Sequence, residues 1–191
     1  MKDRRVAVSL AVLLLFLTVI IALSLYGKAN RVYASGSAAF VVNSPEEAYS
    51  VWEEKKVRGR ILLLFGKYPH IKKSRDYEGV RQLGPSNFIE FAAFNNIVRR
   101  IYYIIPDDNW EAVIQQGAVG SMRRVPGMER GLYLYNLVGI PIIATTPSSL
   151  PKLSETALVY INSGQFGEAQ VRDILSGKGI ASDVVISYRG E

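Results

Sequence analysis

The longest apolar run in the chain is also free of charge. Residues 6–26, VAVSLAVLLLFLTVIIALSLY, contain no Asp, Glu, Lys or Arg. As a helix they would span roughly 30 Å, the thickness of the hydrocarbon core of a bilayer. A buried core helix rarely runs so long without a polar face, and a signal peptide cleaved at Ala34–Ser35 would have an unusually long apolar region. We therefore predict an uncleaved transmembrane anchor over residues 6–26, after a short basic tail, residues 1–5, and before a linker, residues 27–39.

From residue 40 onward, helix-like and strand-like patterns alternate. Ser44 followed by Pro45, with Glu47 three residues after Ser44, is a pattern typical of the beginning of a helix. Further helices are predicted within residues 84–100, 107–117 and 167–179. Continuous apolar runs, which suit strands covered on both faces, occupy residues 60–65, 101–106, 157–164 and 182–188.

Residues 131–146 predict a hairpin whose two strands are joined around Val138 and Gly139, with Pro141 indicating an edge position. Its Tyr133, Tyr135 and Leu137 could pack in the sheet or form an exposed contact face. Together these elements predict an α/β domain over residues 40–191. Its mostly parallel sheet would be flanked by helices, a Rossmann-like three-layer sandwich with an inserted β-hairpin.

The net charge of +6 lies mostly beside the predicted anchor. Residues 1–31 contain five of the 23 Lys and Arg residues and one of the 17 acidic residues, which argues against a nucleic-acid-binding domain. Lys2, Arg4 and Arg5 outnumber Lys28 and Arg31 by one, so the positive-inside rule predicts a domain outside the cytoplasm, with a bacterial inner membrane as the setting. Because the difference is small, a domain that faces the cytoplasm is the alternative. The absence of cysteine is compatible with this location and excludes disulfides and thiolate chemistry.

Ligands of open parallel sheets bind beyond the carboxyl ends of the strands. There the sequence places His70 after one strand, Asp107 after another and hydroxyl groups such as Thr146 after the hairpin. His70 beside Asp107 could act as a general base and Thr146 as a nucleophile, which would make a hydrolase or transferase. The alternative is structural: Asp108, with Glu111 three residues later, would cap a helix, and His70 would be a solvated loop residue.

Basic and aromatic side chains suggest a different use of the same edge. If the long loops meet there, they would attract an anionic ligand such as a lipid phosphate or an acidic polysaccharide; the candidates are Lys67, Tyr68, Lys72, Arg75, Arg123 and Arg124. The alternative is a set of solvated charges scattered round the domain. One histidine, no cysteine and no glycine-rich nucleotide motif lead us to expect neither a metal nor a cofactor.

These patterns predict a membrane protein anchored through residues 6–26. Its extracytoplasmic domain would be a non-catalytic accessory or binding component of a cell-envelope assembly, with an envelope protein or an anionic ligand as partner. A small hydrolase or transferase that acts on an anionic envelope substrate, through the edge around His70, is the alternative.

Overall fold

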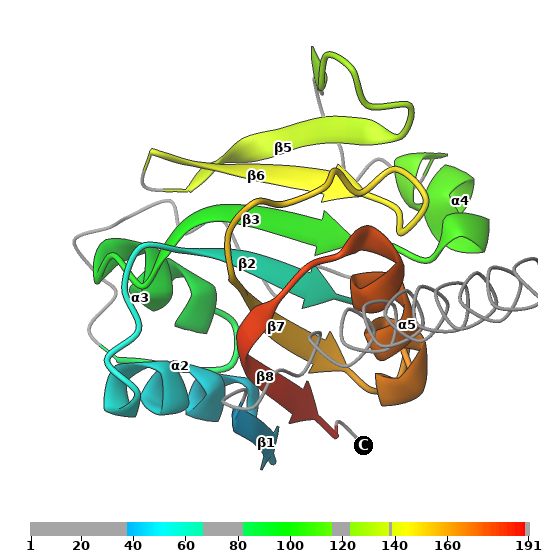
Figure 1. Ribbon diagram of the computed structural model, residues 1–191. Coiled ribbons are helices and arrows are strands. Elements are labelled where there is room, and N and C mark those ends of the chain that lie inside the picture. The colour runs from blue at the N-terminus through cyan, green and yellow to red at the C-terminus, as the bar shows by residue number, and fades with distance from the viewer. Residues whose placement is uncertain (1–37, 67–81, 116–122, 138, 190–191) are drawn as a thin grey trace, which may run out of the picture.

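The computed structural model describes residues 38–66, 82–115, 123–137 and 139–189 (Figure 1). Within these residues the strands are β1 (Ala38–Val42), β2 (Arg60–Phe65), β3 (Val98–Ile104), β4 (Arg123–Arg124), β5 (Gly131–Leu137), β6 (Ile140–Thr145), β7 (Ala157–Asn162) and β8 (Ser182–Tyr188). The helices are α2 (Pro45–Glu54), α3 (Phe88–Phe94), the 3₁₀ turn η3 (Asp107–Asn109), α4 (Trp110–Gln115) and α5 (Glu168–Lys178). The predicted anchor, residues 6–26, lies outside the described ranges, within which no helix is long and apolar enough to cross a membrane.

The eight strands form one sheet in the order β1-β8-β7-β2-β3-β6-β5-β4. Neighbouring strands from β1 to β6 in this order pair in parallel, whereas β5 pairs antiparallel with both β6 and β4. The predicted mostly parallel sheet with a hairpin is therefore confirmed, and the hairpin forms one side of the sheet.

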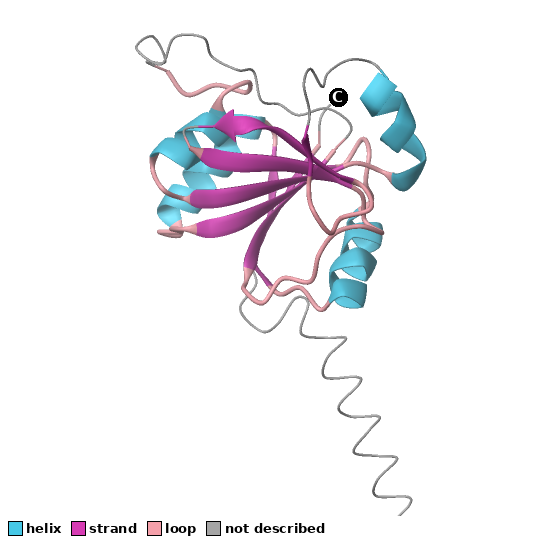
Figure 2. Ribbon diagram, turned by 90° about the horizontal axis from the view of Figure 1, so that it is seen from above, coloured by secondary structure: helices cyan, strands magenta, loops and turns pink. Residues whose placement is uncertain are grey.

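Helices lie on both sides of the twisted sheet (Figure 2). Because successive side chains of a strand point to opposite faces, β2 contributes to two cores. Leu62 and Leu64 pack with Trp52 of α2 and Phe88 of α3. The alternate side chains of β2 point to the other face and pack with Val171 of α5. The molecule therefore has three layers, with α2 and α3 on one face and α5 on the other.

Three local predictions were wrong. The helix predicted within residues 84–100 ends at Phe94, because Asn96 has a left-handed backbone (φ 54°) and Val98–Arg100 open β3. Asp108 does not cap α4; it lies inside the 3₁₀ turn that precedes it. Pro141 is not in an edge strand, since β6 lies between β3 and β5. It is tolerated because pairing with β3 begins one residue later, at Ile142.

β1 was not predicted. It begins two residues inside the range that the sequence assigned to a linker and pairs in parallel with β8. Its first residue, Ala38, is therefore the point at which the chain that follows the predicted anchor enters the sheet.

Candidate functional site

The carboxyl ends of β2 and β7 form the topological switch point of the sheet. The chain leaving β2 leads to β3 on one side, whereas the chain leaving β7 leads through α5 to β8 on the other. Such a point is where open α/β sheets bind ligands. Gly66 follows β2 directly and lies beside Asn162 of β7. A Cβ atom placed at Gly66 would be 3.6 Å from the Cβ of Asn162.

Several predicted site residues belong to the segment that follows Gly66 in the sequence. Lys67 and Tyr68 follow Gly66 in the chain. They lie outside the described residues, as do His70, Lys72 and Arg75. The proposed contact between His70 and Asp107 therefore stays a prediction.

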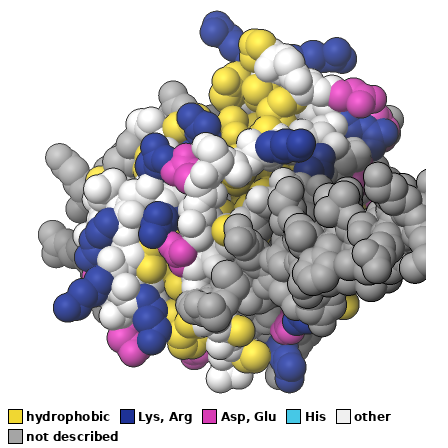
Figure 3. Space-filling model, viewed as in Figure 1, with side chains coloured by type: hydrophobic (Ala, Val, Ile, Leu, Met, Phe, Trp, Pro, Cys, Tyr) yellow, Lys and Arg dark blue, Asp and Glu magenta, His cyan; other side chains and the backbone are white. Residues whose placement is uncertain are grey.

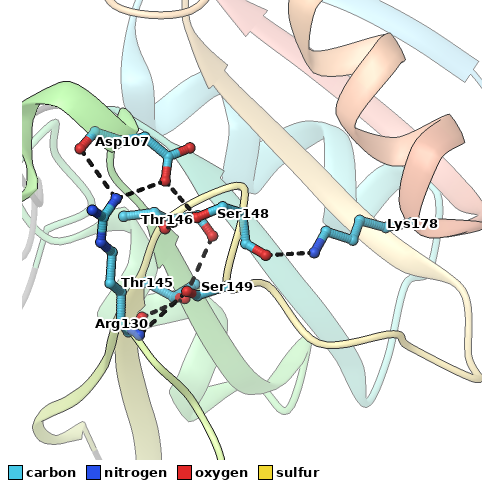
Figure 4. Close-up of polar contacts among 7 residues, drawn as sticks. All are labelled: Asp107, Arg130, Thr145, Thr146, Ser148, Ser149 and Lys178. Carbon is cyan, nitrogen blue, oxygen red and sulfur yellow. Dashed lines mark hydrogen bonds and ion pairs between the residues drawn. The ribbon is translucent and has the colours of Figure 1, made fainter.

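A polar cluster, the Asp107 cluster, lies beyond the carboxyl ends of β3 and β6 (Figure 4). The Ser148 hydroxyl donates a hydrogen bond to Asp107 Oδ1 at 2.5 Å, and Arg130 Nη1 lies 3.1 Å from the same oxygen. Thr146 Oγ1 and Ser148 Oγ are 2.9 Å apart. The structure therefore brings the two predicted residues Asp107 and Thr146 together, with Ser148 between them and Arg130 on the opposite side of the carboxylate.

Backbone contacts hold this cluster in place. Thr145 Oγ1 donates to the carbonyl oxygen of Arg130 at 2.8 Å, and the backbone N–H of Arg130 donates to Ser149 Oγ at 3.2 Å. Lys178, the last residue of α5, donates from Nζ to the carbonyl oxygen of Ser148 at 2.8 Å. The cluster thus connects β6, the segment before β5 and the end of α5.

The surroundings of Asp107 favour its charged form. Partial burial raises the pKa of its carboxyl group, but the hydroxyls of Ser148 and Thr146, the backbone N–H of Ser148 and the positive charge of Arg130 together lower it more. The net effect is a pKa below the ordinary value of 3.8. Asp107 is therefore an ionised acceptor at neutral pH, and a poor proton acceptor for Ser148.

The sequence analysis missed a second polar group, which lies on the α2 and α3 side of the sheet. The Tyr160 side chain of β7 is fully buried, and its hydroxyl has no hydrogen-bond partner among the described residues. Its ring lies 5.3 Å from that of Phe88 and 6.5 Å from that of Tyr188. Burial, followed by the charges of Tyr188 and Glu46, raises the pKa of Tyr160, so the hydroxyl is a neutral group at the end of the β7 strand.

The remaining predicted residues lie elsewhere. Arg123 and Arg124 form β4, the outermost strand beyond β5, and both are exposed. The arginine that reaches the strand ends is Arg130. Only the hairpin register could have indicated it: Gly131 pairs with Thr145, so the residue before it lies beside Thr146.

Comparison with known proteins adds no relative. No protein-family model, curated protein or solved structure matches this chain.

Proposed function

We propose that the chain is a membrane-anchored, extracytoplasmic binding domain that serves as a non-catalytic accessory or binding component of a cell-envelope assembly. The proposal rests on the Asp107 cluster, whose polar side chains are hydrogen-bonded to one another. Anchorage and orientation rest on the apolar run of residues 6–26 and on the basic residues that flank it.

The chemistry of the cluster argues against Asp107 as the base that activates Ser148. A general base works best when its pKa lies near the working pH, whereas the pKa of Asp107 is lowered and its charge is paired with Arg130. A serine that donates to such a carboxylate keeps its proton. The cluster is therefore suited to holding strand ends and loops together beneath a binding surface.

The edge hairpin supplies exposed apolar surface. The side chain of Leu137 is buried, whereas Tyr133 is 39% exposed. Figure 3 shows hydrophobic side chains gathered on the surface at the top of the molecule, where β5 lies in Figure 1. Apolar side chains that are exposed together are typical of contact surfaces, which supports a protein partner at this side of the sheet.

One observation favours the alternative, a hydrolase or transferase. Asp107, Thr146 and Ser148 converge at the strand ends, with Ser148 Oγ 2.5 Å from Asp107 Oδ1. A serine activated by its neighbours would react with an electrophilic fluorophosphonate, whereas an unactivated serine would not.

The two functions can be separated on the full-length chain purified from its native membrane in mild detergent. We expect a stoichiometric partner to co-elute and no fluorophosphonate labelling of Ser148. Tyr133→Ser should release the partner, and Phe94→Ser, which alters a comparably exposed side chain on α3, should retain it. Labelling that Ser148→Ala abolishes and Ser154→Ala leaves intact would instead establish the enzyme.

A further inference from the structure

The end of the sheet opposite the Asp107 cluster, where the strands begin, has a hollow of about 440 Å³. It lies at the amino ends of β1, β2 and β8 and beside the end of α2; its lining is Ala38, Lys55, Lys56, Val57, Arg58, Arg60, Asp183 and Val184. We infer that this basic hollow binds the phosphate groups of anionic lipids in the membrane that holds the anchor. The inference rests on the anchoring part of the proposed function.

Two lysines that line the hollow are available to bind an anion. Arg58 is paired with Glu53 at 3.0 Å, and Arg60 with Asp183 at 2.7 Å. Lys55 and Lys56 are exposed and form no ion pair with the rest of the described chain. The ammonium of Lys55 lies 5.4 Å above the ring of Phe40, which steadies it at the mouth of the hollow.

The end of α2 accounts for part of this charge only. The partial negative charge at a helix C-terminus favours Lys55 and Lys56, but Arg58 and Arg60 come after the helix and line the same hollow. Figure 3 shows Lys and Arg side chains along the left side of the molecule, where α2 ends and β2 begins in Figure 1. Because Arg58 and Arg60 are paired with acidic side chains, the unpaired positive charge of the hollow within the described chain is that of Lys55 and Lys56.

The short segment between the predicted anchor and β1 would keep the hollow near the membrane surface. Ala38 lines the hollow and is the first residue of β1, and residues 27–37 separate it from the predicted anchor. A chain of eleven residues reaches roughly 40 Å at most, so the membrane that holds the anchor would lie within that distance of Ala38. A basic cluster that lies this near a bilayer binds anionic lipids but not neutral ones.

The absence of cysteine from the chain permits a direct test. The full-length protein is labelled with a fluorophore at Ala39→Cys, on the exposed side of β1, and reconstituted in nanodiscs that carry a quencher on lipid headgroups. One set of discs contains phosphatidylcholine, and the other adds phosphatidylglycerol. Gln170→Cys, at the exposed beginning of α5, is the reference label near the carboxyl ends of the strands.

We expect phosphatidylglycerol to increase quenching at Ala39→Cys but not at Gln170→Cys. Loss of one lysine should weaken the interaction about fivefold, so Lys55→Gln with Lys56→Gln should abolish the increase. Arg123→Gln with Arg124→Gln removes the same charge from the far side of the sheet and should leave it unchanged.

Equal quenching in the two lipids, or an increase that survives the double lysine variant, would overturn the inference while the anchor stands. Inorganic phosphate that removes the increase more effectively than chloride of equal ionic strength would assign the hollow to a free anion and reject the lipid. A chain that does not enter the nanodisc would overturn the anchoring itself and, with it, this inference.

Discussion

At the scale of single residues, Asp107 shows how an apparent catalytic acid becomes a structural one. Its Oδ1 atom is contacted by Ser148 from one side and Arg130 from the other. Both groups stabilise the carboxylate and oppose its protonation. The same contacts that make the cluster resemble a catalytic site therefore withhold the basicity that Asp107 would need to activate Ser148.

This environment predicts a pH dependence. Because the pKa of Asp107 is lower in the folded chain than its ordinary 3.8, its stabilising effect is present above that pH and is lost as the pH falls through the folded value. Asp107→Asn should lower the free energy of unfolding by about 1 kcal/mol at neutral pH, and the difference from wild type should shrink below pH 3.8. Urea unfolding at a series of pH values measures both effects.

Asp108→Asn is the matched control, since it removes the same charge from an exposed neighbour. It should leave the unfolding free energy nearly unchanged at every pH. A destabilisation equal to that of Asp107→Asn, or one that persists undiminished in acid, would contradict the proposed role of the cluster.

Tyr160 gives a prediction of opposite sign. Its buried hydroxyl lacks a partner among the described residues, so Tyr160→Phe should leave stability unchanged or raise it by about 1 kcal/mol. Tyr49→Phe is the counterpart, because the Tyr49 hydroxyl accepts a hydrogen bond from Asn95 at 2.9 Å and donates to Glu53 at 3.4 Å. Its loss should cost about 1 kcal/mol. Thermal unfolding compares the two, and a clear loss of stability in Tyr160→Phe would mean that its hydroxyl is satisfied.

The candidate site could be predicted only in part. Strand ends and the rule for parallel sheets were enough to place Asp107 near Thr146. Arg130 could not be placed, because the pairing of β5 with β6 shifts by one residue between Tyr133 and Tyr135. Without this irregularity, counting from the hairpin turn would put Arg130 opposite Pro147 instead of Thr146.

At the scale of elements, long apolar runs and helix-start signals predicted most of the sheet and its helices. β2 and β8 coincide with the predicted runs, β7 ends two residues before its predicted run does, and Ser44 is the N-cap of α2. β1 lacks such a signal, because AAFVV is short and its exposed Val41 is tolerated only at an edge. Its pairing with β8 joins residues far apart in the chain, which no local pattern reveals.

The end of α3 shows the same limit. Apolar residues at helical spacing continue from Phe94 to Ile97 and Val98, but the chain turns at Asn96 and enters β3. Gly59 is part of the reason, since its backbone N–H donates to the carbonyl oxygen of Asn96 at 2.6 Å. A tertiary contact with the segment before β2 thus ends a helix that periodicity alone would extend.

At the scale of the whole molecule, the two ends of the parallel strands have different chemistry. The carboxyl ends have the paired Asp107 cluster and the switch point, whereas the amino ends have the basic hollow and the entry of the chain at Ala38. If the hollow contacts lipid, the switch point at the carboxyl ends of the strands faces away from the membrane. An envelope partner would then meet the domain at the carboxyl ends or along the β5 hairpin.

This arrangement requires the predicted orientation of the anchor, which depends on a small difference in charge. Lys2, Arg4 and Arg5 precede the apolar run, and Lys28 and Arg31 follow it. Because basic residues are retained on the cytoplasmic side, wild type should place the domain outside the cytoplasm. Replacing the three basic residues of the tail by Gln should invert the chain, since the excess then lies after the anchor.

A single Gln170→Cys reports the orientation, because the chain has no other cysteine and this position is exposed. A membrane-impermeant maleimide should label it in intact cells of wild type and only after lysis in the tail variant. Lys28→Gln with Arg31→Gln increases the original asymmetry, so this control should be labelled in intact cells at least as strongly as wild type. Protection of wild type until lysis would place the domain in the cytoplasm. The envelope role would then fail, while the lipid-binding hollow would remain testable on the inner face of the same membrane.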